Sequence, residues 1–332
     1  MNHQTIVVLD FGSQFTQLIA RRLRELSVYA EILPFDTPLA KIRERQPVGI
    51  ILSGGPKSVS DAGAPHCDMA IYESGVPVLG ICYGMQLMTH ALGGSVAPAP
   101  HREFGLATIA IDPEAPLFAD VPRELRVWAS HGDFVQSAPA GFAVTATSAN
   151  APVAAMAAVE RGLYALLFHP EVAHTDYGLE ILRNFAYNVC GCTGDWTMKS
   201  FVGEATARIR EQVGDGRVVC GLSGGVDSSV AAVLIHRAIG DRLTCIFVDN
   251  GVMRQDEAEQ IKKRFERLKL PLVFVDAADL FLNRLAGVTD PETKRKAIGA
   301  AFIEVFEAES KKLGSFDFLA QGTLYPDVIE SI

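Results

Sequence analysis

The stretch "GLSGGVDSS", residues 221–229, lies between two apolar runs, "RVVC" and "VAAVLIHRAI". The first run is typical of a buried strand and the second of a helix. Glycines crowded at such a junction let the backbone approach a phosphate group, and the N-terminus of the following helix attracts negative charge. A Walker loop would carry a lysine here, whereas this loop carries Asp227. The stretch therefore predicts a strand–loop–helix unit that binds phosphate in another way.

The same alternation of strands and helices extends in both directions from this loop. After it come "TCIFVDNG", "LPLVFVDA" and "FDFLAQG", and the first half contains "TIVVLD" (5–10), "GIILSG" (49–54) and "VPVLGI" (76–81). Continuous apolar runs of this length suit the strands of a parallel sheet that is buried on both faces. Residues 105–168 are richer in strand patterns, so we expect a mixed sheet there. The predicted fold class is α/β, with two consecutive α/β domains, each around a mainly parallel sheet.

The length of the chain supports two domains, because 332 residues are about twice the usual domain size. The strand and helix pattern lapses at "CGCTGDWTMKS" (190–200) and then restarts. We therefore predict a first domain over residues 1–192, a linker over 193–203 and a second domain over 204–332.

Composition and charge narrow the class of protein. A net charge of −9 argues against binding to duplex nucleic acid, which requires clustered Lys and Arg. No apolar run is long enough to cross a bilayer, and the start "MNHQTIVVLDFG" lacks the basic region of a signal peptide. Six cysteines at irregular spacing do not indicate a disulfide framework. We expect a cytoplasmic protein that binds neither nucleic acid nor membrane.

A possible nucleophile lies in "GICYGMQ", residues 80–86, between a strand and an apolar helix. Cys82 in that turn would lie at a helix N-terminus with flanking glycines, although a buried strand-end cysteine fits this motif equally well. "FHPEV", residues 168–172, ends another strand and supplies a base, His169, and an orienting acid, Glu171. "SGGP" (53–56), also at a strand end, offers backbone N–H groups for an oxyanion. The combination favours nucleophilic catalysis by cysteine.

This constellation resembles the class I glutamine amidotransferase family over roughly residues 5–190. The resemblance implies that Cys82 attacks the side-chain amide of glutamine, with His169 as base and Glu171 as orienting acid. It further implies oxyanion amides and glutamine contacts at Gly55, Tyr83, Gln86, Ser130, His131 and Asp133. The family often has glutamine just before "FHPE", where this chain has Leu167.

The stretch "SGGVDSS" resembles the signature of the ATP pyrophosphatase, or PP-loop, superfamily. Such a loop holds the β and γ phosphates of ATP as a leaving group while an acceptor oxygen attacks the α phosphorus. The resemblance implies that ATP is a substrate and that Asp227 is a ligand of Mg²⁺. The implied ATP-binding residues are Ser223, Gly224, Gly225, Val226, Asp227, Ser228 and Ser229.

The order of the two domains resembles that of the glutamine-hydrolysing GMP synthase family, whose members are ATP-dependent carbon–nitrogen ligases. The resemblance implies amination of XMP to GMP through an adenyl-XMP intermediate, with glutamine as the ammonia source. Within "KRK" (294–296) it places a contact to XMP at Arg295, where a solvated basic helix face is the alternative. Family members continue beyond "PDVIES" and form homodimers, so the second domain is expected to be incomplete. Two alternatives stay open: a glutaminase-only fragment and a non-catalytic nucleotide-binding module.

Overall fold

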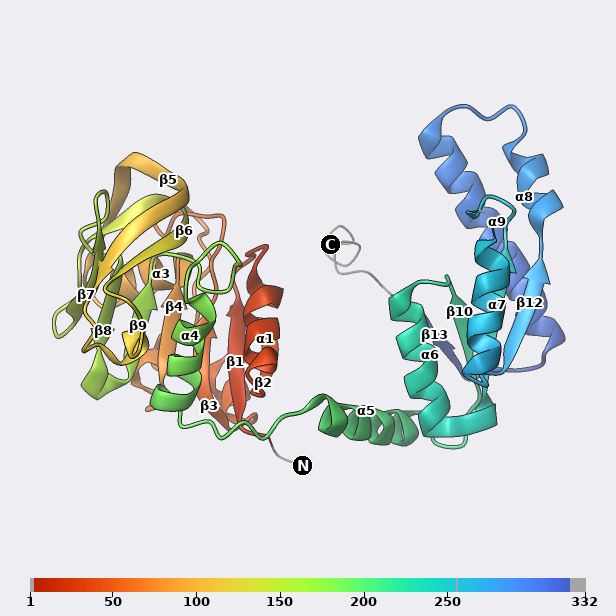
Figure 1. Cartoon of the computed structure of the whole chain (residues 1–332), viewed down its shortest axis with the longest axis horizontal. Helices are drawn as coiled ribbons and strands as arrows, with labels where there is room; N and C mark the ends of the chain where they lie inside the picture. The colour runs from red at the N-terminus through yellow and green to blue at the C-terminus, as the bar shows by residue number, and fades with distance from the viewer. Residues whose placement is uncertain (1–2, 255, 323–332) are drawn as a thin grey trace. The chain divides into compact units, whose positions relative to one another are not determined.

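The computed structural model describes residues 3–254 and 256–322, except for the side chains of residues 100–102. The chain divides into two compact units, Met1–Thr197 and Met198–Ile332 (Figure 1). Helix α5 (Met198–Val213) opens the second unit and begins inside the stretch 193–203 that the sequence suggested as a linker. Each unit is described by itself below. In the described residues no helix is long and apolar enough to cross a membrane.

The first unit is built on a mixed sheet whose strands follow the order β2-β1-β3-β4-β9-β8-β7-β5-β6 in the described part of the chain. The strands are β1 (Thr5–Asp10), β2 (Tyr29–Pro34), β3 (Pro47–Leu52), β4 (Val78–Ile81), β5 (Ser95–Ile111), β6 (Glu124–Ser137), β7 (Ala143–Ser148), β8 (Ala155–Ala158) and β9 (Leu163–Leu166). The half from β2 to β9 is parallel. The half from β9 to β6 is antiparallel, so the sheet as a whole is mixed, as expected from the strand patterns of residues 105–168.

Helices and short turns connect these strands. The helices of the first unit are α1 (Thr16–Glu25), α2 (Leu39–Arg43), α3 (Tyr83–Ala91) and α4 (Gly178–Arg183), and a π-helical segment follows α4 at Asn184–Val189. Single-turn 3₁₀ helices cover Met69–Glu73, Pro116–Phe118 and Val159–Arg161. Helix α1 is amphipathic, because Ile19, Ala20 and Leu23 are buried while two arginines close its last turn.

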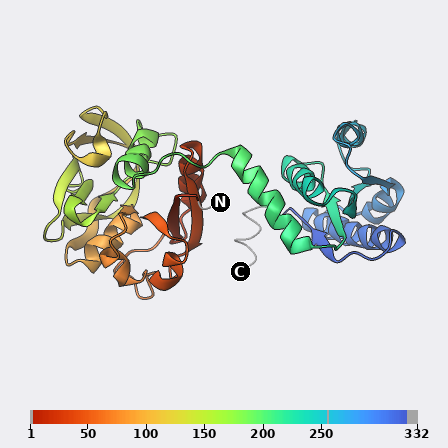
Figure 2. The ribbon, with the colours of Figure 1, turned by 90° about the horizontal axis from the view of Figure 1, so that it is seen from below.

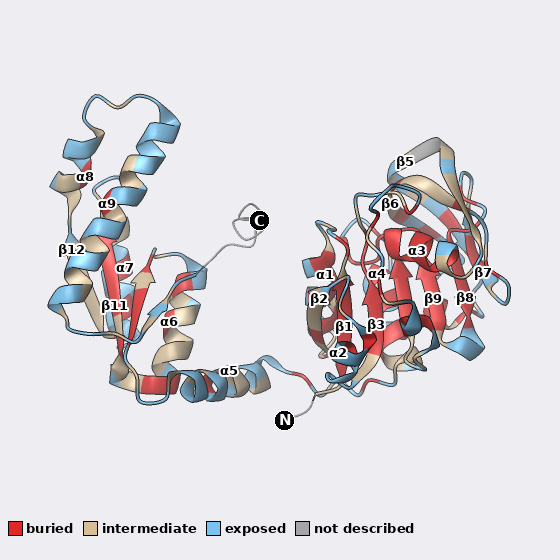
Figure 3. Cartoon of the chain, turned by 180° about the vertical axis from the view of Figure 1, so that it is seen from behind, coloured by how far each residue is buried: buried red, intermediate tan, exposed pale blue. Residues whose placement is uncertain are grey.

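The central parallel strands β1, β4 and β9 are buried because their apolar runs have no polar face. Ile6, Val7, Val8 and Leu9 in β1 are all inaccessible to solvent, and β4 and β9 are buried at every residue. The central strands of the first unit accordingly form its solvent-excluded layer (Figure 3). Packing on both faces therefore holds the carboxyl ends of these strands rigidly. In open α/β sheets, ligands bind at the carboxyl ends of the strands.

The second unit has a fully parallel sheet of four strands in the order β12-β11-β10-β13 within the described residues. Its strands are β10 (Val218–Leu222), β11 (Leu243–Asp249), β12 (Leu272–Asp276) and β13 (Phe318–Ala320). Besides α5, its helices are α6 (Val226–Ile239), α7 (Glu257–Arg267), α8 (Ala278–Leu285) and α9 (Pro291–Lys312), with a 3₁₀ turn at Gly240–Arg242.

Alternating side chains of this second sheet form two separate cores. Cys220 and Phe247 pack with residues of α6 and α7, such as Phe265. Val219 and Ile246 point the other way and pack with Phe281 of α8 and with α9. Figure 2 shows α6 and α9 on opposite sides of these strands. The prediction of a second α/β domain with a parallel sheet is thus confirmed.

Candidate active site

Cys82 lies on a sharp turn between β4 and α3, and its backbone is strained. Its φ of 53° and ψ of −104° are unusual for a residue with a side chain and cost about 1–3 kcal/mol. Two glycines make the turn possible. A Cβ on Gly84 would lie 2.4 Å from the carbonyl oxygen of Leu52, and one on Gly80 would lie 2.6 Å from the carbonyl of Gly84. This is the geometry of a nucleophile elbow, which exposes a side chain at the edge of a sheet.

The thiol of Cys82 lies where three chain segments meet. Its Sγ donates to the carbonyl oxygen of Ser130 in β6, with a separation of 3.6 Å. Gly54, at the end of β3, lies beside it: a Cβ there would be 3.7 Å from Cys82 Cβ and 3.1 Å from His169 Cε1. A side chain at this position would press on the imidazole, and glycine avoids that contact. Cys82, at the end of β4, is therefore bordered by three other segments: the ends of β3 and β9 and the middle of β6.

His169 and Glu171 form a buried pair just after β9. The distance from His169 Nδ1 to Glu171 Oε1 is 2.7 Å, and Glu171 is inaccessible to solvent. Burial alone would lower the pKa of His169, but the charge of Glu171 and hydrogen bonds with Cys82 and Glu171 outweigh it and raise this pKa to about 10. The imidazole therefore carries a proton at neutral pH and can donate it to a leaving group.

The backbone of the histidine loop is fixed by neighbouring side chains. Thr175 Oγ1 donates to the carbonyl oxygen of His169 at 2.6 Å and accepts the N–H of Trp128 in β6 at 2.9 Å. Arg22 Nε in α1 donates to the carbonyl oxygen of Glu171 at 3.0 Å. The ring of Phe15 packs edge-on against His169, with centroids 5.1 Å apart. Neighbouring segments thus hold the imidazole in place from several sides.

A pocket of about 360 Å³ opens beside Cys82 and is large enough for an amino acid. It brings together most of the residues that the sequence placed at a glutamine site. Its lining consists of Gly55, Pro56, Lys57, Ser58, Cys82, Gln86, Phe104, Ser130, His131, Gly132 and Asp133. Gln86 Nε2 donates to the carbonyl oxygen of Asp133 at 3.0 Å, which ties α3 to β6 at the pocket wall.

Tyr83 differs from the other predicted residues, because its side chain does not line this pocket. The ring is fully buried and its hydroxyl donates to the carbonyl oxygen of Pro65 at 2.7 Å. Burial raises the pKa of this phenol to about 12, so it does not exchange protons near neutral pH. Only its backbone N–H is left for the predicted oxyanion role.

In the second unit, the loop 223–225 connects β10 to α6 and the remaining predicted residues form the first turn of that helix. Gly224 has a φ of +77°, a conformation that glycine adopts without strain. Ser223 and Ser228 contact each other through their hydroxyls at 3.1 Å, and Ser229 Oγ donates to the carbonyl oxygen of Gly225 at 2.6 Å. The carboxylate of Asp227 is exposed in the first turn. The helix N-terminus is thus open to an anion.

The predicted Mg²⁺ ligand is Asp227 and the predicted XMP contact is Arg295. No cluster of three or more His, Cys, Asp or Glu residues that could hold a metal occurs among the described residues. A Mg²⁺ ion that shares phosphate oxygens needs only one or two carboxylates, so Asp227 fits such a site. Arg295 lies on α9, and its guanidinium forms hydrogen bonds of 2.9 and 2.8 Å to both carboxylate oxygens of Glu292.

Two family sequence patterns match the chain, one in each unit. The sequence pattern of glutamine amidotransferase class-I matches residues 7–189, more than half of the chain. The chain belongs to the class-I glutamine amidotransferase family. The pattern of the NAD synthase family matches residues 201–296, which include the loop 223–229.

Two curated relatives of this amidotransferase are similar over nearly its whole length. It is 57% identical to "GMP synthase [glutamine-hydrolyzing]" of Ruminiclostridium cellulolyticum over 332 residues, which are 100% of this chain and 65% of that protein. It is 59% identical to the protein of the same name from Carboxydothermus hydrogenoformans over 327 residues, 98% of this chain and 64% of that protein. The chain thus spans slightly less than two thirds of the length of these relatives.

A solved structure also resembles the first unit of the amidotransferase. It is a protein from Thermoplasma acidophilum that is described as one subunit of a GMP synthase, with a TM-score of 0.53 and 34% identity. The match covers 57% of this chain and 96% of that chain.

Several residues at the two sites were not predicted from the sequence. Lys57 lies two residues after the predicted Gly55, and Thr175 lies four residues after the predicted Glu171, so short motifs already contained a signal for them. Phe104 lines the pocket although 66% of it is exposed. Arg264 Nη1 in α7 donates to the carbonyl oxygen of Gly224 at 3.5 Å. It lies 40 residues further along the chain, and no local pattern connects it to the loop.

Proposed function

We propose that the first unit hydrolyses glutamine to glutamate and ammonia through a thioester on Cys82. The observation that carries this proposal is the 2.7 Å contact between His169 and Glu171 next to an elbow cysteine that borders a pocket. A protonated imidazole beside the sulfur can protonate the departing nitrogen, while the sulfur attacks the amide carbon. Backbone N–H groups of Gly55 and Tyr83 would stabilise the oxyanion.

The chemical balance of this reaction needs only glutamine and water. Cys82 reacts as a thiolate, with its proton on His169. The sulfur forms a bond to the amide carbon, and the carbon–nitrogen bond breaks as ammonia leaves with that proton. His169 then removes a proton from water, which attacks the thioester and releases glutamate. Gln86, Ser130, His131 and Asp133 line the pocket in which glutamine would lie.

For the whole protein we propose glutamine-dependent conversion of XMP to GMP, with ATP cleaved to AMP and pyrophosphate. The names of the two curated relatives support this activity. In the second unit, the residues Ser223–Ser229 would hold the phosphates of ATP at the start of α6. Asp227 would bind a Mg²⁺ ion, which neutralises charge on the leaving pyrophosphate. Arg295 would contact the phosphate of XMP, and the full-length protein would be a homodimer.

The cellular setting follows from the chemistry of the cysteines. All six are free thiols, and each lies in the described part of the chain. Free thiols that include a nucleophile suit a reducing compartment, so we keep the prediction of a cytoplasmic enzyme.

Two assays on the purified chain test the two halves of this proposal. Glutamate release from glutamine, abolished in Cys82→Ala, tests the first unit. Formation of AMP that depends on XMP, measured with glutamine or ammonium chloride, tests the second. Glutamate release without AMP from either nitrogen source would favour the glutaminase-only alternative. Failure of both in a folded sample would favour a non-catalytic module.

A further inference from the structure

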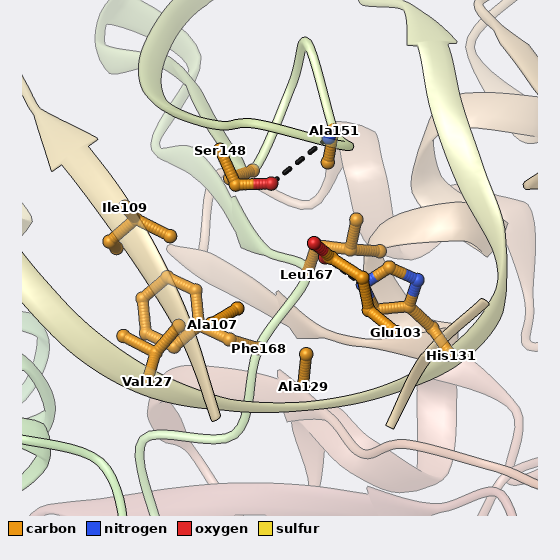
Figure 4. A pocket seen from close by; sticks show the side chains of 11 residues that line it. Glu103, Ala107, Ile109, Val127, Ala129, His131, Ser148, Ala151, Leu167 and Phe168 are labelled. Atoms are coloured by element: carbon orange, nitrogen blue, oxygen red, sulfur yellow. Dashed lines mark hydrogen bonds and ion pairs between the residues drawn. The ribbon is translucent and has the colours of Figure 1, made fainter. Parts of the chain in front are cut away.

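Two charged side chains next to the proposed sites, Glu103 and Arg264, take no part in the chemistry proposed above. In the first unit, Glu103 Oε2 lies 3.3 Å from His131 Nε2 beside a small cavity that both residues line (Figure 4). The cavity measures about 10 Å³, which is close to the minimum for one water molecule, so it has no room for a ligand. In the second unit, Arg264 contacts the glycine-rich loop, and this contact bears on the proposed binding of ATP.

Helix α7 contacts the loop at Gly224 through two residues that lie three positions apart. Ile261 is buried, and a Cβ on Gly224 would be 2.2 Å from its Cδ1 atom, so the glycine packs directly against it. Arg264 Nη1 donates to the carbonyl oxygen of Gly224 at 3.5 Å. Residues three apart lie on the same side of a helix, so one face of α7 holds both the Cα atom and the carbonyl group of Gly224.

The contact with Arg264 sets the direction of the peptide group between Gly224 and Gly225. No cis peptide bond occurs in the described residues, and in a trans peptide the carbonyl and the N–H point in opposite directions. Because the carbonyl points to α7, the N–H of Gly225 points away from that helix. This N–H donates to Ser223 Oγ at 3.3 Å, and Ser223 Oγ lies 3.1 Å from Ser228 Oγ. One backbone N–H and two hydroxyls are thus gathered on one side of the loop.

Donors gathered in this way suit a phosphate oxygen. They lie next to the first turn of α6, where the helix N-terminus also favours negative charge. Glycine on both sides of the peptide leaves the backbone free to rotate, and a rotated peptide would present its carbonyl oxygen to the anion. Two negative groups would then face each other. The hydrogen bond from Arg264 to the carbonyl oxygen opposes that rotation.

The charge of Arg264 is also available to the loop. Its neighbour Lys263 pairs with Glu259 at 3.4 Å, whereas Arg264 has no ion pair with a carboxylate in the described part of the chain. The stretch 221–229 contains no lysine or arginine and includes Asp227. Arg264 therefore brings a positive charge to a loop that has none of its own.

We propose that Arg264 is a positioning residue for ATP binding, which holds the carbonyl of Gly224 toward α7 and so keeps the N–H of Gly225 directed at the phosphates. This inference rests on the proposed role of residues 223–229 in binding ATP. Arg264 acts through the peptide group, and the loop itself contacts the phosphates.

Three single replacements in the full chain test this role. Arg264→Met removes the donor and keeps most of the side-chain length, Arg264→Lys keeps a charged donor, and Lys263→Met removes a charge from the neighbouring position. Calorimetry measures the binding of ATP with Mg²⁺ and of pyrophosphate. We expect both ligands to bind about fivefold more weakly to Arg264→Met, about twofold more weakly to Arg264→Lys and with native affinity to Lys263→Met. Equal weakening by the two methionine variants would indicate a general effect of charge and would overturn the inference.

The orientation of the peptide is tested without ATP. Exchange of the Gly225 amide hydrogen with water is measured by NMR on protein labelled with nitrogen-15 glycine. A peptide that rotates more often loses its hydrogen bond to Ser223, so we expect exchange to be about threefold faster in Arg264→Met than in the native chain or in Lys263→Met. Native exchange combined with weaker binding of ATP would mean that the guanidinium itself contacts the phosphates, which contradicts a positioning role.

The remaining outcomes separate this inference from the proposed function. Arg264→Met should keep the native melting temperature, because the side chain is exposed, so weaker binding would not reflect unfolding. If the unaltered chain binds neither ATP nor pyrophosphate, the proposed ATP site is refuted together with the inference. If the unaltered chain binds both ligands and Arg264→Met binds them equally tightly, the inference on Arg264 is refuted while the ATP site stands.

Discussion

At the scale of single residues, two neighbouring side chains restrict the position of His169, the histidine of the proposed triad. His169 is held through its ring by Glu171 and through its backbone by Thr175. Glu171 sets the proton affinity of the ring, while Thr175 sets its place relative to β6. The two contributions can be separated by experiment, because one is electrostatic and the other is a pair of hydrogen bonds.

The charge of Glu171 makes the stability of the first unit depend on pH. The pKa of His169 is about 10 in the folded chain and about 6.5 in an unfolded one. The folded form therefore binds more protons between these values, so this stabilisation is complete below about pH 6.5 and is lost as pH rises through about 10. Melting temperatures from pH 6 to 10 should fall less steeply in Glu171→Gln. An equally steep fall in that variant would show that another group titrates.

Replacing Thr175 by valine preserves shape but removes both hydrogen bonds of its hydroxyl. The carbonyl oxygen of His169 and the N–H of Trp128 would be left unsatisfied, at a cost of about 1–3 kcal/mol in the free energy of unfolding. We expect glutamate release to slow roughly tenfold or more, since small misplacement of a catalytic group has a large effect on rate. Thr175→Ser is the matched control and should restore most of the rate. A fully active valine variant would rule out the positioning role.

At the scale of elements, the elbow depends on close contact between α3 and β3. The approach of Gly84 to Leu52 leaves no room for a methyl group, and the strained Cys82 backbone is kept in place by the same packing. Helix α5 contrasts with this arrangement. It is exposed over much of its length, and a Cβ on its Gly203 would meet nothing within 4 Å.

Alanine at these two glycines should therefore have opposite effects. Gly84→Ala forces α3 away from β3 and should lower the free energy of unfolding by about 1–3 kcal/mol. The rate of glutamate release should also fall, because the elbow that holds Cys82 is displaced. Gly203→Ala should raise the stability of α5 by about 0.5–1 kcal/mol, because glycine is a poor helix former. Denaturant unfolding of both variants gives the comparison. A stable, active Gly84→Ala would mean that the elbow tolerates a wider helix–strand distance.

At the scale of the whole molecule, two units carry two different sites. Cys82, His169 and Glu171 lie within residues 1–197, and the glycine-rich loop that we propose as a phosphate site lies within the second unit. Their cores are separate clusters of buried side chains. A change in one loop should therefore leave chemistry in the other unit intact, unless the two sites are coupled during turnover.

Asp227→Ala tests this separation, because its carboxylate is exposed and supports no packing. We expect weaker binding of ATP in the presence of Mg²⁺ and loss of XMP-dependent AMP formation in a full-length relative carrying the same change. Basal glutamate release should stay within about twofold of native, as expected for distant, independent sites. Calorimetry with ATP and a glutamate assay on one sample provide both readings. Loss of glutamate release in a folded Asp227→Ala protein would contradict independent sites.

The elements and the local chemistry follow from the amino-acid sequence alone. Apolar runs located the buried strands, and short motifs placed Cys82 at a helix start and His169 next to Glu171, because these features depend on neighbours within a few residues. The lining of the pocket, in contrast, depends on the tertiary structure. Phe104 reaches it from β5, which is far in the chain from the loop that contains Gly55, and Arg264 contacts the loop 223–225 from another helix. Such contacts depend on strand order and register, which are fixed by burial of the whole sheet and leave no mark in a local pattern.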